Sequence, residues 1–141
     1  MSELVNVAVD AMGGDNAPGE IIKGAVEALG ESEKVKVFLV GQEEVLKKHL
    51  AEFTYEKDRL EIVNATEIIE TAEPPVNAIR KKKDSSIVKA MGMVKAGTCD
   101  AYVSAGSTGA NLVGGQVLVG RIKGLIASLH RLRNFTGPLT R

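Results

Sequence analysis

The sequence predicts an α/β protein with a mostly parallel sheet layered between helices on both faces. Short apolar, β-branched stretches alternate along the chain with longer stretches whose apolar residues recur at helical spacing. Repeated alternation of this kind indicates parallel strands joined by right-handed crossovers. The chain has 141 residues, no formal net charge and 44% hydrophobic residues, so it is large enough for one domain with a core.

The first half of the chain predicts three strands and two helices. Residues 4–10 are typical of a buried strand, and apolar residues follow at helical spacing over residues 19–30. A second strand is predicted over residues 34–40 and a helix over residues 42–53, in which acids come first and lysines later, as the helix dipole favours. Residues 60–64 predict the third strand.

The second half continues the alternation after a break at Glu73-Pro74-Pro75. A short helix is predicted over residues 76–82 and a longer one over residues 86–96, because apolar residues recur there at helical spacing. Residues 100–103 predict a fourth strand, which leads into a further apolar helical stretch. Both halves therefore predict the same layered arrangement.

A turn rich in glycine and polar residues joins the first strand to the first helix over residues 10–18 (D-A-M-G-G-D-N-A-P). Gly13 and Gly14 let a ligand approach the backbone without meeting a Cβ, and the following helix aims its free N–H groups at that place. A tight connection alone would explain two glycines, but two carboxylates, Asp10 and Asp15, and the amide of Asn16 add more polar chemistry than a connection needs. We therefore expect an anion site here.

A second turn of similar design follows the fourth strand over residues 104–110 (S-A-G-S-T-G-A). Small residues let backbone N–H groups face a ligand, and the hydroxyls add hydrogen-bond donors. In open α/β sheets ligands bind at the carboxyl ends of the strands, so both turns are expected at one cleft. The candidate binding residues of this turn are Ser104, Gly106, Ser107, Thr108 and Gly109.

A run of four cations, Arg80 to Lys83, immediately precedes the helix predicted over residues 86–96. Asp84, Ser85 or Ser86 is expected to cap that helix. Two interpretations stand equally: a capped helix with a solvated basic approach, or a second anion site built from the helix N-terminus, two hydroxyls and several cations. The second interpretation would bring this helix start to the same cleft.

Several classes of protein are not supported. Neither G-x-G-x-x-G nor G-x-x-x-x-G-K-[ST] occurs, which counts against a standard dinucleotide site and a P-loop NTPase. Tryptophan is absent and aromatic residues are few, so a nucleic-acid stacking platform is not expected. No apolar run approaches the ~18 residues of a membrane span. The single Cys99 excludes an internal disulfide and fits a cytoplasmic protein.

These motifs, taken together, resemble the bacterial phosphate acyltransferases of phospholipid synthesis, the PlsX family. The resemblance covers most of residues 4–124, in the family's order and spacing, and it includes Gly120-Arg121-Ile122-Lys123-Gly124. Two positions differ from the family pattern, since Asn64 stands where a histidine is usual and Ser107 where an asparagine is frequent. The motifs that carry the resemblance are residues 10–18, Asn64 to Glu67, Glu73 to Pro75, Arg80 to Ser86 and Ser104 to Ala110.

The resemblance implies a Rossmann-like fold similar to the isocitrate/isopropylmalate dehydrogenase-like and phosphotransacetylase folds, and incomplete in this chain. It implies transfer of a fatty acyl group from acyl-[acyl carrier protein] to inorganic phosphate, without a metal or an organic cofactor. Asp15, Asn16 and Lys83 are the candidate catalytic residues; the glycine turns, Ser85 and Ser86 would bind phosphate or substrate. A homo-oligomer is expected, peripheral membrane association is a family property, and no nucleic-acid partner is expected.

Residues 125–141 depart from the family pattern. They contain no acid and scattered basic residues, and we interpret them as a non-native or frame-shifted tail after residues 1–124, the N-terminal part of an acyltransferase domain. A short basic amphipathic helix that touches a membrane or a partner is the competing interpretation. Two alternatives to the implied activity remain: a catalytically incomplete fragment of that enzyme, or a phosphotransacetylase-like enzyme that uses coenzyme A.

Overall fold

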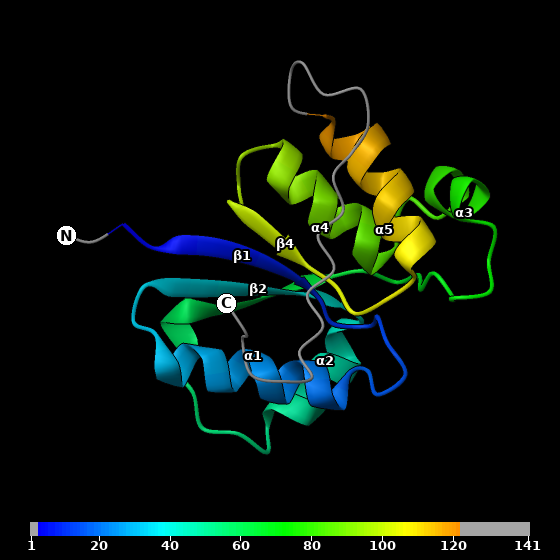
Figure 1. Ribbon diagram of the computed structural model, residues 1–141. Coiled ribbons are helices and arrows are strands. Elements are labelled where there is room, and N and C mark those ends of the chain that lie inside the picture. Colours follow the sequence, from blue (N-terminus) through cyan, green and yellow to red (C-terminus); the bar gives the residue numbers. More distant parts are fainter. Residues whose placement is uncertain (1–2, 122–141) are drawn as a thin grey trace, which may run out of the picture.

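The computed structural model describes residues 3–121, and the predictions made for residues 125–141 lie outside this range. Helices lie on both faces of one four-stranded sheet (Figure 1). The strands have the order β3-β2-β1-β4, and all three neighbouring pairs are parallel. The predicted layered, Rossmann-like α/β arrangement is therefore confirmed. The strands are β1 (Val5–Asp10), β2 (Val35–Gly41), β3 (Leu60–Asn64) and β4 (Ala101–Val103).

Each predicted helix is present, with ends that move by a few residues. The helix predicted over residues 42–53 ends at Leu50, and the next residues form tighter turns in which Phe53 N–H donates to the carbonyl oxygen of Leu50 (3.1 Å). A π-helical segment, η2 (Gly115–Val119), follows α5 directly and was not predicted. The helices are α1 (Gly19–Glu31), α2 (Glu43–Leu50), α3 (Pro75–Lys81), α4 (Ser86–Lys95) and α5 (Thr108–Gly114).

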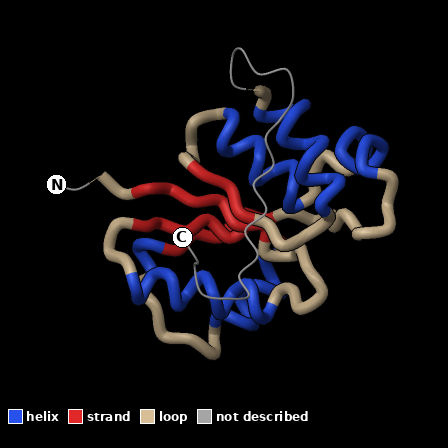
Figure 2. The backbone as a smooth tube through the Cα atoms, in the orientation of Figure 1, coloured by secondary structure: helices blue, strands red, loops and turns tan. Residues whose placement is uncertain are grey.

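Both faces of the sheet are covered, which explains why its central strands carry consecutive apolar residues over residues 7–9 and 37–40. Val9 and Leu39 pack into a core with α1 and α2, whereas Phe38 and Val40 pack into a core beneath α4. Successive side chains of a strand point to opposite faces, so a strand buried on both faces needs apolar residues at consecutive positions. Figure 2 shows the two groups of helices on opposite sides of the red strands.

A short 3₁₀ helix, η1 (Lys57–Arg59), was not predicted, and it places an arginine against the end of α1. The Arg59 guanidinium donates to the carbonyl oxygens of Leu29 (2.8 Å), Ser32 (2.6 Å) and Val35 (3.2 Å). Carbonyls at a helix C-terminus lack partners within the helix, so this side chain satisfies groups that would otherwise need water. It also joins α1 to the start of β2.

Two glycines within helices provide a test of stability, because one is exposed and the other is closely packed. Gly24 in α1 is exposed and an added Cβ would meet nothing within 4 Å, whereas a Cβ at Gly114 in α5 would lie 2.5 Å from Met91 Sδ. Gly24→Ala is therefore expected to raise the free energy of unfolding by about 0.5–1 kcal/mol. Gly114→Ala is expected to lower it by about 1–3 kcal/mol through overpacking. Urea denaturation checks both, and equal effects would contradict the packing described for α5.

Candidate functional site

The two glycine turns lie against each other at the carboxyl ends of β1 and β4. These strands pair directly, with Val9 opposite Val103, so the turns that follow them start side by side. A Cβ added at Gly13 would lie 2.9 Å from both the Cα and the N of Gly106, and one added at Gly106 would lie 3.2 Å from the Cα of Gly13. The parallel pairing of β1 and β4 therefore brings the two predicted turns into contact.

A buried carboxylate, Asp10, lies where the turns meet. Its side chain is fully buried, Oδ2 accepts a hydrogen bond from Ser104 Oγ (2.8 Å), and Oδ1 accepts one from the Met12 N–H (3.2 Å). Ser104 Oγ also accepts from the Gly106 N–H (3.0 Å). One carboxylate thus organises both turns, because it bonds its own turn directly and the other through a hydroxyl.

Asp10 was counted among the carboxylates of the first turn but was not predicted as a site residue. The available signal is its place in the strand alternation. Ala8 faces the core beneath α4, so Asp10, two residues on, points to the same covered side of the sheet. A charged residue at an inward-facing strand position needs hydrogen-bond partners, and that requirement indicates a polar centre.

A tyrosine and an asparagine extend the polar centre towards α5. Asn111 Nδ2 donates to Ser104 Oγ (3.3 Å), and the Tyr102 hydroxyl donates to Asn111 Oδ1 (2.5 Å). Burial raises the pKa of Tyr102 well above its ordinary value, and the nearby charge of Asp10 acts in the same direction. Tyr102 therefore remains a protonated hydrogen-bond donor, which fixes the orientation of the Asn111 amide.

Glycine is required at the two positions of the first turn for different physical reasons. Gly13 is buried, and a side chain there would overlap Asp10 Oδ2 and the backbone of Gly106. Gly14 is exposed and has φ of +109°, a conformation that L side chains rarely adopt. Within residues 3–121 the N–H group of Gly14 donates to no acceptor. The surface of the joined turns therefore presents a free backbone donor at Gly14.

The polar residues after Gly14 are solvent-exposed. Asp15 and Asn16 both lie on the surface, and neither side chain makes a hydrogen bond within the described part of the chain. The carbonyl oxygen of Asn16 accepts from the Glu20 N–H (3.2 Å), which places these residues directly before α1. They border the turn and remain candidate catalytic residues.

The second turn begins α5 with a serine cap. Ser107 is buried, and its Oγ accepts a hydrogen bond from the Ala110 N–H (3.2 Å). Thr108 is exposed beside it. A Cβ at Gly109 would lie 2.7 Å from Pro75 Cγ, so this glycine also allows α3 to pack against the start of α5. Of these three residues, Thr108 offers its side chain to solvent.

The start of α4 is a separate cluster. Ser85, one of the three predicted alternatives, is the N-cap of α4. Its Oγ accepts a hydrogen bond from the Val88 N–H (3.3 Å). Ser86 is buried, and Lys83 is exposed. Within residues 3–121 no hydrogen bond or ion pair joins this cluster to either glycine turn. The structure brings the two turns together and leaves the helix start beside β3.

Asp84 is the electrostatic centre of that cluster. Its carboxylate forms an ion pair with Lys89 Nζ (2.5 Å) and accepts hydrogen bonds from the Thr66 hydroxyl and the Thr66 N–H. The hydrogen bond from Lys89 is the largest cause that lowers the pKa of Asp84 to about 2, and the hydrogen bonds from Thr66 act in the same direction. The group therefore stays ionised and joins α4 to the segment after β3.

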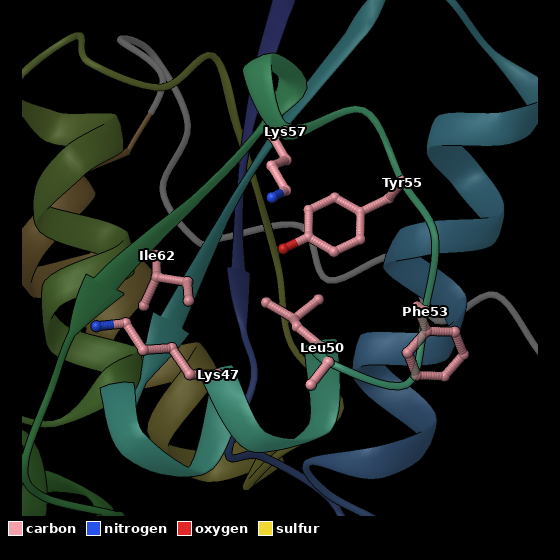
Figure 3. Close-up of a pocket in the computed structure, with 7 residues that line it drawn as sticks. Lys47, Leu50, Phe53, Tyr55, Lys57 and Ile62 are labelled. Atoms are coloured by element: carbon pink, nitrogen blue, oxygen red, sulfur yellow. The ribbon is translucent and has the colours of Figure 1, made fainter.

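A cavity of about 280 Å³ lies elsewhere, beside the end of α2 (Figure 3). The Tyr55 hydroxyl and the Lys57 ammonium approach each other over Leu50 and Ile62. No predicted site residue lines this cavity, so it is distinct from the glycine turns. Its lining residues are Lys47, Leu50, Ala51, Phe53, Tyr55, Lys57 and Ile62.

Within residues 3–121, no group of three or more His, Cys, Asp or Glu side chains is placed to hold a metal ion. In the same range, none of the helices combines the length and the apolar character needed to cross a membrane.

Comparisons with known proteins give consistent matches. A family model described as "fatty acid synthesis protein" matches residues 5–128. A phosphate acyltransferase of Clostridium beijerinckii is 51% identical over 86% of this chain and 36% of its own length. A phosphate acyltransferase of Syntrophomonas wolfei is 48% identical over 96% of this chain and 43% of its own length. The chain thus spans less than half the length of these curated relatives.

The bond between Ser104 and Asp10 provides a test of the polar centre. Ser104→Ala removes one donor to a buried carboxylate and one acceptor of the Gly106 N–H, so unfolding free energy should fall by about 1–3 kcal/mol. Thr54→Ala is the control, because Thr54 is exposed and makes no hydrogen bond within residues 3–121; its effect should stay within about 0.5 kcal/mol. Denaturant titration measures both. A loss at Ser104 no greater than at Thr54 contradicts the role given to this bond.

Proposed function

The chain belongs to the family of fatty acid synthesis proteins, and from this premise we propose that the complete protein transfers a fatty acyl group to inorganic phosphate. The acyl donor is an acyl-[acyl carrier protein], and the products are acyl phosphate and the free carrier thiol. Two relatives that bear the name phosphate acyltransferase support the acyl transfer. The observation that carries the proposal in this chain is the exposed, unpaired N–H of Gly14 at the junction of two glycine turns.

The reaction needs little covalent chemistry from the protein. A phosphate oxygen attacks the thioester carbonyl carbon, a tetrahedral oxyanion forms, and the C–S bond breaks to release the carrier thiolate, which takes up a proton. Phosphate is already a nucleophile, so the site must hold it against the carbonyl and stabilise the oxyanion. Preorganised backbone N–H groups do both, and the Asp10–Ser104 bond fixes the turns that carry them.

Each predicted site residue takes a place in this proposal. Gly14 and Thr108 bind phosphate or the oxyanion, while Gly13, Gly106 and Gly109 allow the close packing that positions them. Ser104 and Ser107 fix the second turn through its hydrogen bonds. Lys83 supplies positive charge in front of the capped start of α4, where Ser85 and Ser86 lie.

Asp15 and Asn16 orient the first turn or contact the leaving thiol. A carboxylate beside a phosphate is repulsive unless a donor intervenes, so we propose that Asp15 acts at the leaving-group side. Its exposed position supports this arrangement, since solvent screens it from the anion. We also propose that the complete protein is a cytoplasmic homo-oligomer that uses no metal or organic cofactor.

Two alternatives have distinct support. The chain spans 36% of the length of the Clostridium beijerinckii relative, which favours the alternative that the present chain alone is catalytically incomplete. A coenzyme A-dependent, phosphotransacetylase-like transfer would use the same turns, because a thioester presents the same carbonyl to phosphate. Whether the reaction requires the acyl carrier protein or coenzyme A as the acyl donor distinguishes the proposal from this second alternative.

The first experiment compares this 141-residue chain with the same chain extended by the C-terminal part of a relative. Acyl phosphate formed from acyl-[acyl carrier protein] and phosphate is trapped with hydroxylamine and measured as the hydroxamate. We expect activity in the extended protein and none in the short chain. Activity with acyl-coenzyme A alone in the extended protein overturns the choice of donor, and no activity with either donor overturns the proposed function.

A second experiment tests the role of Gly14 in phosphate binding. Gly14→Ala strains a residue of positive φ, and Gly97→Ala is a matched control, because Gly97 also has positive φ (+79°), is exposed and lies at the end of α4. Gly97→Ala should cost roughly 1–2 kcal/mol of stability, and Gly14→Ala should cost more, because its Cβ would also lie 3.1 Å from the carbonyl oxygen of Ala105. In the extended protein, only Gly14→Ala should raise the KM for phosphate, by about tenfold or more. An equal change in KM for the two variants contradicts a ligand role for this turn.

A further inference from the structure

Three exposed cations, Arg80, Lys81 and Lys83, form a basic cluster at the junction between α3 and α4. Lys82, in the middle of the run, is used internally: its Nζ donates to the carbonyl oxygen of Ile68 (2.6 Å) and pairs with Glu73 Oε1 (2.5 Å). Within residues 3–121, none of the three cluster side chains forms a hydrogen bond or an ion pair. The fold therefore fixes Lys82 and leaves its neighbours in solvent.

Two acids close to the basic cluster in sequence form ion pairs with other cations. Glu73 pairs with Lys82, and Asp84 pairs with Lys89 (2.5 Å). Glu67 Oε2 accepts a hydrogen bond from the Asp84 N–H (3.0 Å). Glu73 and Asp84 neutralise Lys82 and Lys89, and no acid among these three forms an ion pair with the three exposed cations, which face solvent. Such a patch attracts an acidic partner from a distance and orients its approach.

The basic cluster lies at the same edge of the sheet as the glycine turns. Lys89 Nζ donates to the carbonyl oxygen of Asn64 (2.6 Å), which places the start of α4 at the carboxyl end of β3. All strands are parallel, so their carboxyl ends share one edge (Figure 1). Pro75 of α3 also packs on Gly109 of the second turn. A macromolecule bound at the cluster would therefore stand beside the candidate site.

We propose that the basic cluster is a docking surface for an acidic protein, namely the carrier that presents the acyl group; the choice of partner rests on the proposed function. Exposed lysine and arginine side chains bind one small anion weakly, because solvent screens each pair. A protein surface with several carboxylates engages all three cations at once and gains by their summed charge. The exposed side chains of Arg80 and Lys81 suit a rim contact that guides the carrier, and Lys83 lies between them and the capped start of α4.

The test measures binding of purified acyl carrier protein to this chain by fluorescence anisotropy at low and high salt. The double variant Arg80→Glu/Lys81→Glu reverses the cluster and leaves Lys83 in place. The matched control Lys23→Glu/Lys48→Glu makes the same change of charge on α1 and α2, at exposed residues that cover the other face of the sheet. We expect the Kd to rise about tenfold or more in the first variant and to stay within about twofold in the control.

The outcomes separate the docking surface from other uses of the same charges. Equal weakening in both variants, or no binding of the carrier by the unmodified chain at low salt, overturns the docking surface. A raised KM for phosphate in the extended protein, with carrier binding unchanged, overturns it too and makes the cluster a phosphate site. The proposed function is tested separately, by hydroxamate formation in the extended protein. Either proposal can therefore fail while the other stands. Circular dichroism checks that both variants keep their helices.

Discussion

The buried carboxylate of Asp10 is the constraint on which the candidate site depends. It lies at the end of a central strand with no cation partner in the described range, and it is satisfied by a hydroxyl from the neighbouring strand end and an N–H of its own turn. A buried charge with too few donors would be costly, so the Ser104 hydroxyl and the Met12 N–H must stay close. The turns that follow β1 and β4 are consequently held in one arrangement.

The start of α4 is held in a different way, by ion pairs at the surface. Asp84 lies between Lys89 and Thr66, and Lys82 reaches back to Glu73. These pairs are partly exposed, so each adds little stability by itself. Their effect is geometric, because they fix the segment between β3 and α4 and set which cations remain free. The polar centre at Asp10 and the charged cluster at α4 are therefore built by separate interactions.

The layered fold could be predicted from the sequence because strands buried on both faces and amphipathic helices leave clear patterns. The patterns are local, so they gave neither the strand order nor the contact between β1 and β4, which bring Gly13 to Gly106. Arg59 was not anticipated for the same reason, since its three carbonyl partners lie more than twenty residues away in sequence. Asp10 was not assigned a site role because its partner Ser104 lies 94 residues further along the chain.

The glycines of the two turns show why a motif cannot be divided simply into structural and ligand-binding parts. Gly13 has no room for a side chain because Asp10 and Gly106 occupy that space, and Gly109 has none because Pro75 does. Gly14 differs, since the residue is exposed and has a positive φ, and a Cβ there would lie 3.1 Å from the carbonyl oxygen of Ala105. Close packing of Gly13 and Gly109 holds the loops rigid, and rigidity is what makes a single exposed N–H effective towards an anion. Gly13, which is buried, and Gly109, which is half-buried, thus support the proposed binding site through packing.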